Sequence, residues 1–362
     1  MKCVRTYLFL VAALTVGTCP AVAQQSLLER LEHASPQQVQ KLLERFPQAD
    51  ANQDGTLTRS EAVAYAREKL GTPQKTPPAR GIAPTHANVA YGPHARNTLD
   101  FWQAEGTGPR PLVIFIHGGG FVGGDKSKWH DDEHLRQLLS AGVSCAAINY
   151  RFIQHAPIQD ILHDAALAVQ VLRSRAADWQ LDPSQFAAWG GSAGAGTSLW
   201  LASRDDLADP SHEDPVRHQS SRVQAAVLNA TQATYDLTRW DAFLGPADAT
   251  WRRGEQEPAF FYHVASAEQL QTPEGKAVLR ECDMLAWIDT ADAPVFVSNP
   301  GPDTPPTNRN QYVHHPAHAR EIQKACDACG VACHWKQGPT PCEFQDPLAF
   351  VLAVFEIDEL NK

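Results

Sequence analysis

The sequence predicts an α/β protein whose mostly parallel central sheet is flanked by helices, with a helical segment before it. The first observation is a set of short apolar runs typical of strands buried on both faces: residues 112–117, 143–149, 186–190, 223–229, 294–298 and 331–335. The second is that helical stretches such as 160–179 alternate with these runs, as parallel sheets require. Residues 235–290 are a longer, irregular insertion that we interpret as a cap between two strands.

The composition indicates a globular chain and argues against two classes of partner. Of the 362 residues, 43% are hydrophobic, which is enough for a sizeable core. The formal charge of −10 disfavours binding to nucleic acid or to an anionic membrane surface. Nothing in the sequence indicates an oligomeric state.

The first residues have the three parts of a secretory signal peptide. Lys2 and Arg5 precede an apolar run at 7–16, and Ala21-Val22-Ala23 supplies an A-x-A cleavage site. The run is too short to span a bilayer, which takes about 20 apolar residues. We therefore expect residues 1–23 to be removed and the mature protein to be secreted or periplasmic, with no membrane anchor.

Residues 50–61, DANQDGTLTRSE, fit the template of an EF-hand calcium loop. Helical sequence flanks the loop, and Gly55 stands where the template needs a sharp turn. Five positions offer oxygen ligands: Asp50, Asn52, Asp54, Thr56 through its carbonyl, and Glu61. The alternative is an acidic, solvated turn. We predict that the helical segment 24–70 binds a structural Ca²⁺, and that a Pro/Gly-rich linker, 71–85, joins it to the main domain, 86–362.

Two glycine motifs indicate serine-dependent acyl transfer. Gly190-Gly191-Ser192-Ala193-Gly194 is a G-x-S-x-G between an apolar strand and a small-residue helix, the setting of a nucleophile elbow that exposes Ser192. The run HGGG, 117–120, follows an earlier strand, and its free N–H groups can stabilise an oxyanion. We expect Gly118, Gly119 and Ala193 to be the donors. The alternative for each motif is a packing turn, but their order and context favour chemistry.

With these motifs, residues 86–362 resemble the HGGG-type carboxylesterases of the α/β-hydrolase superfamily, related to hormone-sensitive lipase. The segment 163–196, which leads into the serine, agrees with this resemblance. The chain also resembles secreted bacterial members that carry an EF-hand-like segment. The resemblance implies hydrolysis of small esters through an acyl-enzyme, with no cofactor for catalysis, by Ser192, a histidine and an acid in that chain order.

The acid and the histidine of this triad each have more than one candidate. Asp303 is the nearest carboxylate after the strand at 294–298 and is our candidate, although a Pro-rich loop often carries an Asp for its turn. The family's histidine follows the last strand, where this chain has Cys342 instead. Three readings stay open: a relocated base among His314, His315 and His318, for which we select His315; Cys342 acting as the base; or a broken triad.

Six cysteines lie beyond the signal peptide, and export permits disulfides. We expect Cys145, within an apolar run, to be a buried thiol. We expect one or two disulfides among the others, with Cys342 pairing with Cys333 or another neighbour. The sequence thus predicts a secreted carboxylesterase-like serine hydrolase, acting on small or acylated carbohydrate-type esters. The rival interpretation is a catalytically impaired protein that binds ligands or makes calcium-dependent interactions.

Overall fold

The computed structural model describes residues 36–44, 46–50, 55–58, 61–63, 65, 81–248, 251 and 257–357. The chain divides into two compact units, Met1–Pro78 and Ala79–Lys362, and the boundary falls inside the predicted linker. The predicted signal peptide, 1–23, lies outside the described residues. In the described ranges, every helix is too short or too polar to cross a lipid bilayer.

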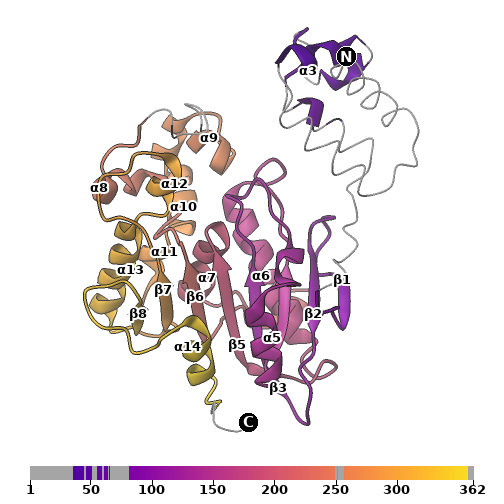
Figure 1. Ribbon diagram of the computed structural model, residues 1–362, viewed down its shortest axis with the longest axis vertical. Coiled ribbons are helices and arrows are strands. Elements are labelled where there is room, and N and C mark those ends of the chain that lie inside the picture. Colours follow the sequence, from indigo (N-terminus) through magenta and orange to yellow (C-terminus); the bar gives the residue numbers. More distant parts are fainter. Residues whose placement is uncertain are drawn as a thin grey trace, which may run out of the picture. The chain divides into compact units, whose positions relative to one another are not determined.

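The larger unit is built on an eight-stranded sheet with the order β1-β2-β4-β3-β5-β6-β7-β8 (Figure 1). From β4 to β8 all neighbouring strands are parallel. The strands are β1 (His86–Ala90), β2 (Thr98–Trp102), β3 (Arg110–Ile116), β4 (Ser144–Ile148), β5 (Leu181–Gly191), β6 (Ala225–Asn229), β7 (Val295–Ser298) and β8 (Cys333–Trp335). Each of the six apolar runs singled out in the sequence forms a strand, which confirms the predicted fold class.

The first two strands were missed, because their pattern differs from that of the central strands. β1 pairs with β2, and β2 with β4, both antiparallel. β1 is mostly exposed, so its sequence, HANVA, lacks the apolar run that marks a strand covered on both faces. An edge strand of this kind is recognised only once its neighbour is in place.

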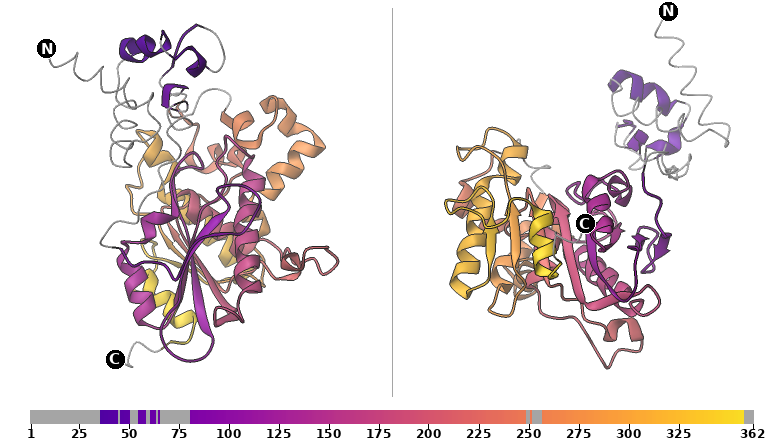
Figure 2. Two further views of the ribbon diagram at one scale, coloured as in Figure 1. Left: turned by 90° about the vertical axis from the view of Figure 1, so that its right-hand side faces the viewer. Right: turned by 60° about the horizontal axis from the view of Figure 1, so that its bottom comes forward.

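Helices cover both faces of the sheet (Figures 1 and 2). Side chains from α5 (Glu133–Ser140) and α14 (Pro347–Val354) pack with one set of strand residues. Side chains from α6 (Ile158–Ser174), α7 (Ala193–Ser203), α11 (Met284–Trp287) and α13 (Pro316–Cys329) pack with the alternate set. Consecutive residues of β3 illustrate this division, since Val113 belongs to the first cluster and Ile114 to the second.

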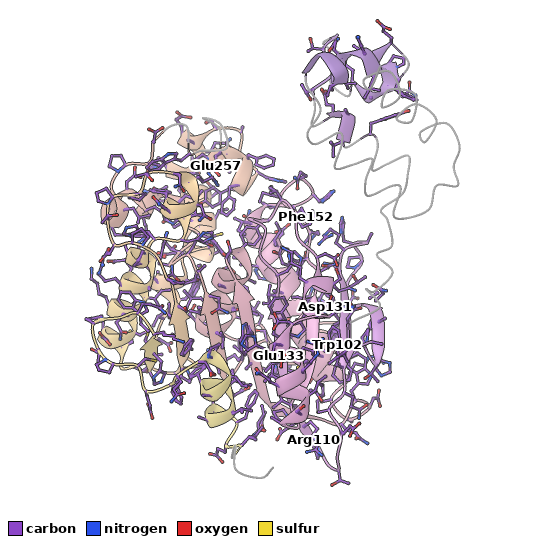
Figure 3. The ribbon with its side chains drawn as sticks, in the orientation of Figure 1. Trp102, Arg110, Asp131, Glu133, Phe152 and Glu257 are labelled. Carbon is purple, nitrogen blue, oxygen red and sulfur yellow. The ribbon has the colours of Figure 1, made fainter. Side chains whose placement is uncertain are left out.

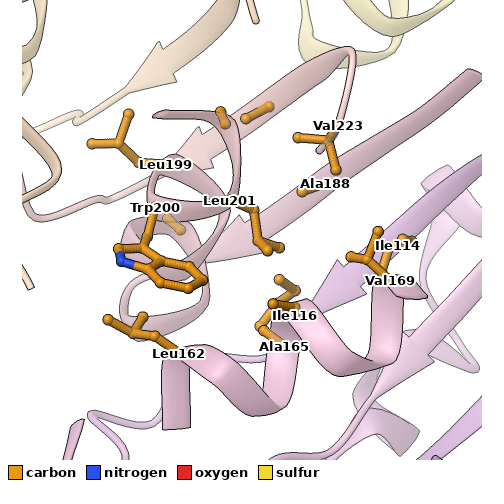
Figure 4. Close-up of a cluster of buried hydrophobic side chains, with 14 of the residues drawn as sticks. Ile114, Ile116, Leu162, Ala165, Val169, Ala188, Leu199, Trp200, Leu201 and Val223 are labelled. Carbon is orange, nitrogen blue, oxygen red and sulfur yellow. The ribbon is translucent and has the colours of Figure 1, made fainter. Parts of the chain in front are cut away.

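The α6–α7 side of this core supports the start of α7 (Figure 4). Ile114 and Ile116 of β3 pack in one cluster with Val169 of α6 and Leu201 of α7. Trp200 is fully buried, and its indole N–H donates to the carbonyl of Glu281 at 2.9 Å. Because α7 is fixed along its length in this way, the turn that precedes it is held in place.

The segment predicted to be a cap connects β6 to β7 and is largely helical where it is described. Its elements are η4 (Leu237–Arg239), α8 (Asp241–Leu244), α9 (Glu257–Tyr262), η6 (Ala267–Gln271), α10 (Pro273–Glu281) and α11. After β7 the chain forms α12 (Arg309–Val313), which lies close to α8 and α9 in Figure 1. The loop 204–222 carries η3 (Pro215–His218), and η2 (Lys126–Trp129) follows the glycine-rich loop after β3.

The smaller unit has its own apolar cluster. Its described elements are α3 (Pro36–Leu43), η1 (Pro47–Ala49) and the helical residues 61–63 and 65. Val39, Leu42 and Phe46 pack there with Leu57 and Val63, from both sides of the predicted calcium loop. Leu57 is 3% exposed, as expected for the loop position that packs against flanking helices.

Candidate active site

Ser192 occupies a sharp turn between β5 and α7. Its φ of 53° and ψ of −120° are strained for a non-glycine residue, which is typical of a nucleophile elbow. The turn requires Gly194, because a Cβ there would lie 1.9 Å from the carbonyl oxygen of Ile116. The amide of Ser192 donates to Asn229 O at 2.8 Å, which ties the elbow to β6. The sequence motif therefore forms the predicted strand–turn–helix.

A cavity of about 710 Å³ opens beside Ser192. Gly119, Gly120 and Ala193 line it, whereas Gly118 does not and instead packs against the elbow backbone. Ala193 is the first residue of α7, so its N–H has no acceptor within the helix. The structure thus places Gly119, Gly120 and Ala193 along the cavity beside the serine, and Gly118 against the backbone of the elbow.

Buried groups hold the glycine-rich loop in position. His117 is fully buried and its Nδ1 lies 2.8 Å from Gly118 O. Burial lowers the pKa of His117 to about 4, so the ring is neutral and Nδ1–H donates to that carbonyl. The hydroxyl of Tyr150 donates to His117 O at 2.5 Å, and the Arg96 guanidinium lies 3.4 Å from His117 Nε2. These contacts fix the loop before any ligand enters.

His314 is the histidine that contacts the serine. Its Nε2 lies 2.8 Å from Ser192 Oγ, and both residues line the cavity. His314 directly follows α12, and the Gln232 side chain donates to Val313 O at 2.7 Å while Asn299 Nδ2 lies 3.4 Å from His314 O. This geometry lets a neutral His314 accept the Ser192 proton.

The partner of His314 is an amide rather than a carboxylate. Asn310 lies one helical turn earlier, and its Oδ1 is 3.0 Å from His314 Nδ1. With Nδ1–H donating to Asn310, Nε2 is left free to accept from the serine hydroxyl. Burial lowers the pKa of His314, and hydrogen bonding to the backbone of Asn310 partly offsets that effect. The arrangement is a Ser192–His314–Asn310 chain in which burial favours the neutral form of the base.

The structure corrects the predicted base and acid. His315 caps α13, with Nδ1 accepting from Ala317 N at 3.0 Å and Nε2 lying 3.1 Å from Thr304 O, so neither nitrogen is available to Ser192. Asp303 forms an ion pair with Arg320 and lies 4.0 Å from His315, and it does not line the cavity. The Asp303 carboxylate is 56% exposed, as is typical of a surface turn.

His318, the third candidate histidine, has a structural role in the core. His318 is fully buried, with Nδ1 accepting from Ala233 N at 3.2 Å and Nε2 lying 3.3 Å from Tyr312 O. Burial lowers its pKa to about 3, so it stays neutral. Of the three candidates in the sequence, the structure therefore brings only His314 to the serine. The i,i+4 spacing of Asn310 and His314 was the available signal, but it carries no carboxylate to draw attention.

Cys342 lies away from this chemistry. It packs beside α14 against the α5–α14 cluster and is not among the cavity-lining residues. All six described cysteines are free thiols, which corrects the expectation of disulfides and confirms that Cys145 is a buried thiol. Contact with Cys326, together with burial, raises the pKa of the Cys333 thiol well above its usual range.

The described part of the predicted calcium loop has one buried carboxylate oxygen without a hydrogen-bond partner. Asp50 is 7% exposed, its Oδ2 accepts from Gly55 N at 2.9 Å, and its buried Oδ1 has no hydrogen-bond partner among the described residues. Gly55 has φ of +81°, as the turn requires. Glu61 Oε2 accepts from Thr58 N at 2.9 Å at the start of the following helix. Asn52 and Asp54 lie outside the described residues.

Comparisons with known proteins agree with this fold. The BD-FAE family model matches residues 99–303, more than half of the chain. A solved structure titled a truncated form of carbohydrate esterase from gut microbiota has a TM-score of 0.56 at 17% identity, covering 72% of this chain and 88% of that one. At that identity the likeness shows the fold, which is that of an α/β-hydrolase.

Curated relatives match a shorter region. A probable carboxylic ester hydrolase, LipM, of Mycobacterium tuberculosis is 30% identical over 163 residues, 44% of this chain and 37% of its own. A probable isoprenylcysteine alpha-carbonyl methylesterase, ICMEL1, of Arabidopsis thaliana is 29% identical over 139 residues, 38% of this chain and 29% of its own. The chain thus spans about a third of the length of these relatives.

Proposed function

Because the chain belongs to the BD-FAE family, we propose that it is a serine carboxylic ester hydrolase that acts through an acyl-enzyme. The observation that carries this proposal is the 2.8 Å contact between Ser192 Oγ and His314 Nε2 at the edge of a large cavity. The relatives named as esterases support the reaction class.

In the proposed mechanism Ser192 Oγ attacks the ester carbonyl while His314 takes its proton. The amides of Gly119 and Ala193 stabilise the oxyanion that forms. Protonated His314 then gives the proton to the leaving alcohol, and a water molecule releases the acid by the same route. Asn310 holds the imidazole in the productive tautomer and orientation throughout, without balancing its charge.

The residues that line the cavity favour, as substrate, a small ester with a polar, carbohydrate-type alcohol. The cap contributes both aromatic and polar side chains, among them Trp240, Trp251, Thr238 and Asp241. Aromatic faces with nearby hydrogen-bonding groups suit a ligand that is apolar on its faces and polar at its edges. The carbohydrate esterase with the same fold is in keeping with this choice.

We further propose that the protein is exported and that a structural Ca²⁺ binds its N-terminal unit. The unpartnered, buried Asp50 Oδ1 supports the ion, with Asp50 and Glu61 as carboxylate ligands and Thr56 offering its carbonyl. Asn52 and Asp54 complete the set by sequence. Bound Ca²⁺ supplies charge neutralisation for this loop and takes no part in the ester chemistry.

Fluorophosphonate labelling of the mature protein tests the proposed function. We expect labelling at Ser192, its loss in Ser192→Ala, and a loss of about 10³-fold or more in rate for His314→Gln. His315→Gln is the matched control and should label at nearly the parental rate. Absence of labelling in the parent would refute the hydrolase and favour the rival, a ligand-binding protein. Equal labelling of the parent and His314→Gln would instead refute His314 as the base.

A further inference from the structure

The helix that carries the His314–Asn310 pair is joined to the cap by a charged contact. Arg309, the first residue of α12, donates to Glu257 of α9 through both terminal nitrogens, at 2.7 Å to Oε1 and 3.3 Å to Oε2. A second donation from Arg309 reaches the carbonyl of Trp251. Figure 3 shows Glu257 on the cap, at the same end of the molecule as α12 in Figure 1.

The bidentate ion pair between Arg309 and Glu257 is stronger than an ordinary surface ion pair. The Glu257 side chain is 15% exposed and that of Arg309 is 36% exposed, so water screens the pair only in part. The planar guanidinium also fixes the direction of its partner, which a single point charge does not do. The pair therefore constrains where α12 begins.

The first turn of α12 is closed by a local cap, in which Asn308 Oδ1 accepts from Gln311 N at 3.0 Å, and it is tied to the cap segment by side chains of the helix. α12 is a helix of five residues, too short to be stable without tertiary contacts. Its second link to the cap is Tyr312, whose hydroxyl lies 3.3 Å from Asp241 Oδ1 and whose ring packs near Trp240 and Trp251. The local cap gives α12 its first turn, and the contacts of Arg309 and Tyr312 set where that turn, with Asn310, lies against the cap segment.

We propose that Arg309 and Glu257 are positioning residues that couple the cap to the base by holding α12 so that His314 meets Ser192. Both residues line the cavity, so a ligand bound between the cap and the serine lies against the same pair that sets the base. When the Arg309–Glu257 ion pair is broken, the first turn of α12 is free to move. Asn310 then moves away from His314 Nδ1, and water reaches the imidazole. The expected fall in kcat rests on the proposed function. The placement of His314 does not, because it can be measured without turnover.

The charged and titratable groups around His314 are few. Ser192 and Asn310 contact its ring, the neutral, buried His318 and the adjacent His315 lie nearby, and Arg309, Glu257 and Asp241 line the same cavity. Since burial lowers the pKa of His314, admitting water should return that pKa toward its ordinary value of about 6.5. A purely structural role for the ion pair would leave that titration unchanged.

The test is a nuclear magnetic resonance titration of His314, assigned with His314→Gln, in the parent, Arg309→Gln, Glu257→Gln and the double variant. We expect a midpoint below 6.5 in the parent and a midpoint close to about 6.5 in each single variant. The double variant should shift no further than Arg309→Gln, because the ion pair is already lost in each single variant. Arg239→Gln, which removes the cap's ion pair with Asp283, is the matched control and should leave the midpoint unchanged.

Kinetics of a short-chain aryl ester provide the second readout. We expect kcat to fall by about 10- to 100-fold in each single variant with a smaller change in KM, since misplacing a catalytic group by about 1 Å costs that much. An unchanged His314 midpoint in both single variants would overturn the proposal even if kcat fell. The two proposals can also fail separately. If the His314 midpoint differs between the parent and the single variants while the parent neither labels nor hydrolyses the ester, the coupling is upheld and the hydrolase function is refuted.

Discussion

Replacing Asn310 with aspartate tests whether the amide beside His314 sets the behaviour of the base. The side chains have nearly the same shape, so the change puts a carboxylate oxygen where Asn310 Oδ1 now lies, 3.0 Å from His314 Nδ1. The carboxylate stabilises the imidazolium and raises the pKa of His314. Activity that depends on the neutral imidazole is then lost at a higher pH than in the parent, as the pH falls.

The size of the effect follows from the separation of the charges. Unit charges about 4 Å apart interact by about 4 kcal/mol at an effective dielectric constant of about 20. Each pKa unit corresponds to about 1.4 kcal/mol, so the upper limit is about 3 units. Asn310 is exposed and solvent screens the pair, so we expect an upward shift of about 1–2 units.

The assay is the pH dependence of kcat/KM for a short-chain aryl ester. The parent should lose activity with a midpoint below about 6.5, because burial lowers the pKa of His314. Asn310→Asp should move this midpoint upward by the stated amount and raise the plateau kcat about tenfold or more, since the imidazolium formed during attack gains a counter-charge.

A matched control separates this contact from added charge in general. Asn308 caps α12 by accepting from Gln311 N at 3.0 Å, and aspartate caps a helix equally well. Asn308→Asp therefore adds the same charge two residues away without touching His314. If the two variants give the same profile, or if Asn310→Asp leaves the midpoint where it is in the parent, the Ser192–His314–Asn310 chain is not the catalytic arrangement.

Two further predictions concern residues outside this chain. Cys342→Ser should retain the parental kcat/KM within about twofold, because Cys342 packs beside α14 and not in the cavity; a loss of tenfold or more would return Cys342 to the mechanism. Millimolar Ca²⁺ should raise the melting temperature of the N-terminal unit in the parent but not in Asp50→Ala. At ten times Kd the bound ion adds about 1.4 kcal/mol to the free energy of unfolding. An equal rise in both proteins, or none in the parent, would count against the site.

Much of the fold was readable in the sequence because its signals are local. Six apolar runs alternate with helices, and the two glycine motifs follow strands that the structure confirms as β3 and β5. Gly194 has no room for a side chain, so the residue type itself reports the close approach of strand and helix. Ser192 and the glycine-rich loop could be placed together from the same logic, since parallel strands end at one edge of the sheet.

The base could not be identified in this way, because three neighbouring histidines differ only in the direction of their side chains. His314 follows α12 and meets Ser192, His315 caps the next helix, and His318 points into the core. His314 is the residue after α12 and His315 is the extended residue before α13, so the break between two helices directs these neighbouring side chains to different places. The sequence determined the nucleophile and the frame that exposes it, and tertiary packing alone decided that His314 faces it and that Cys342 does not.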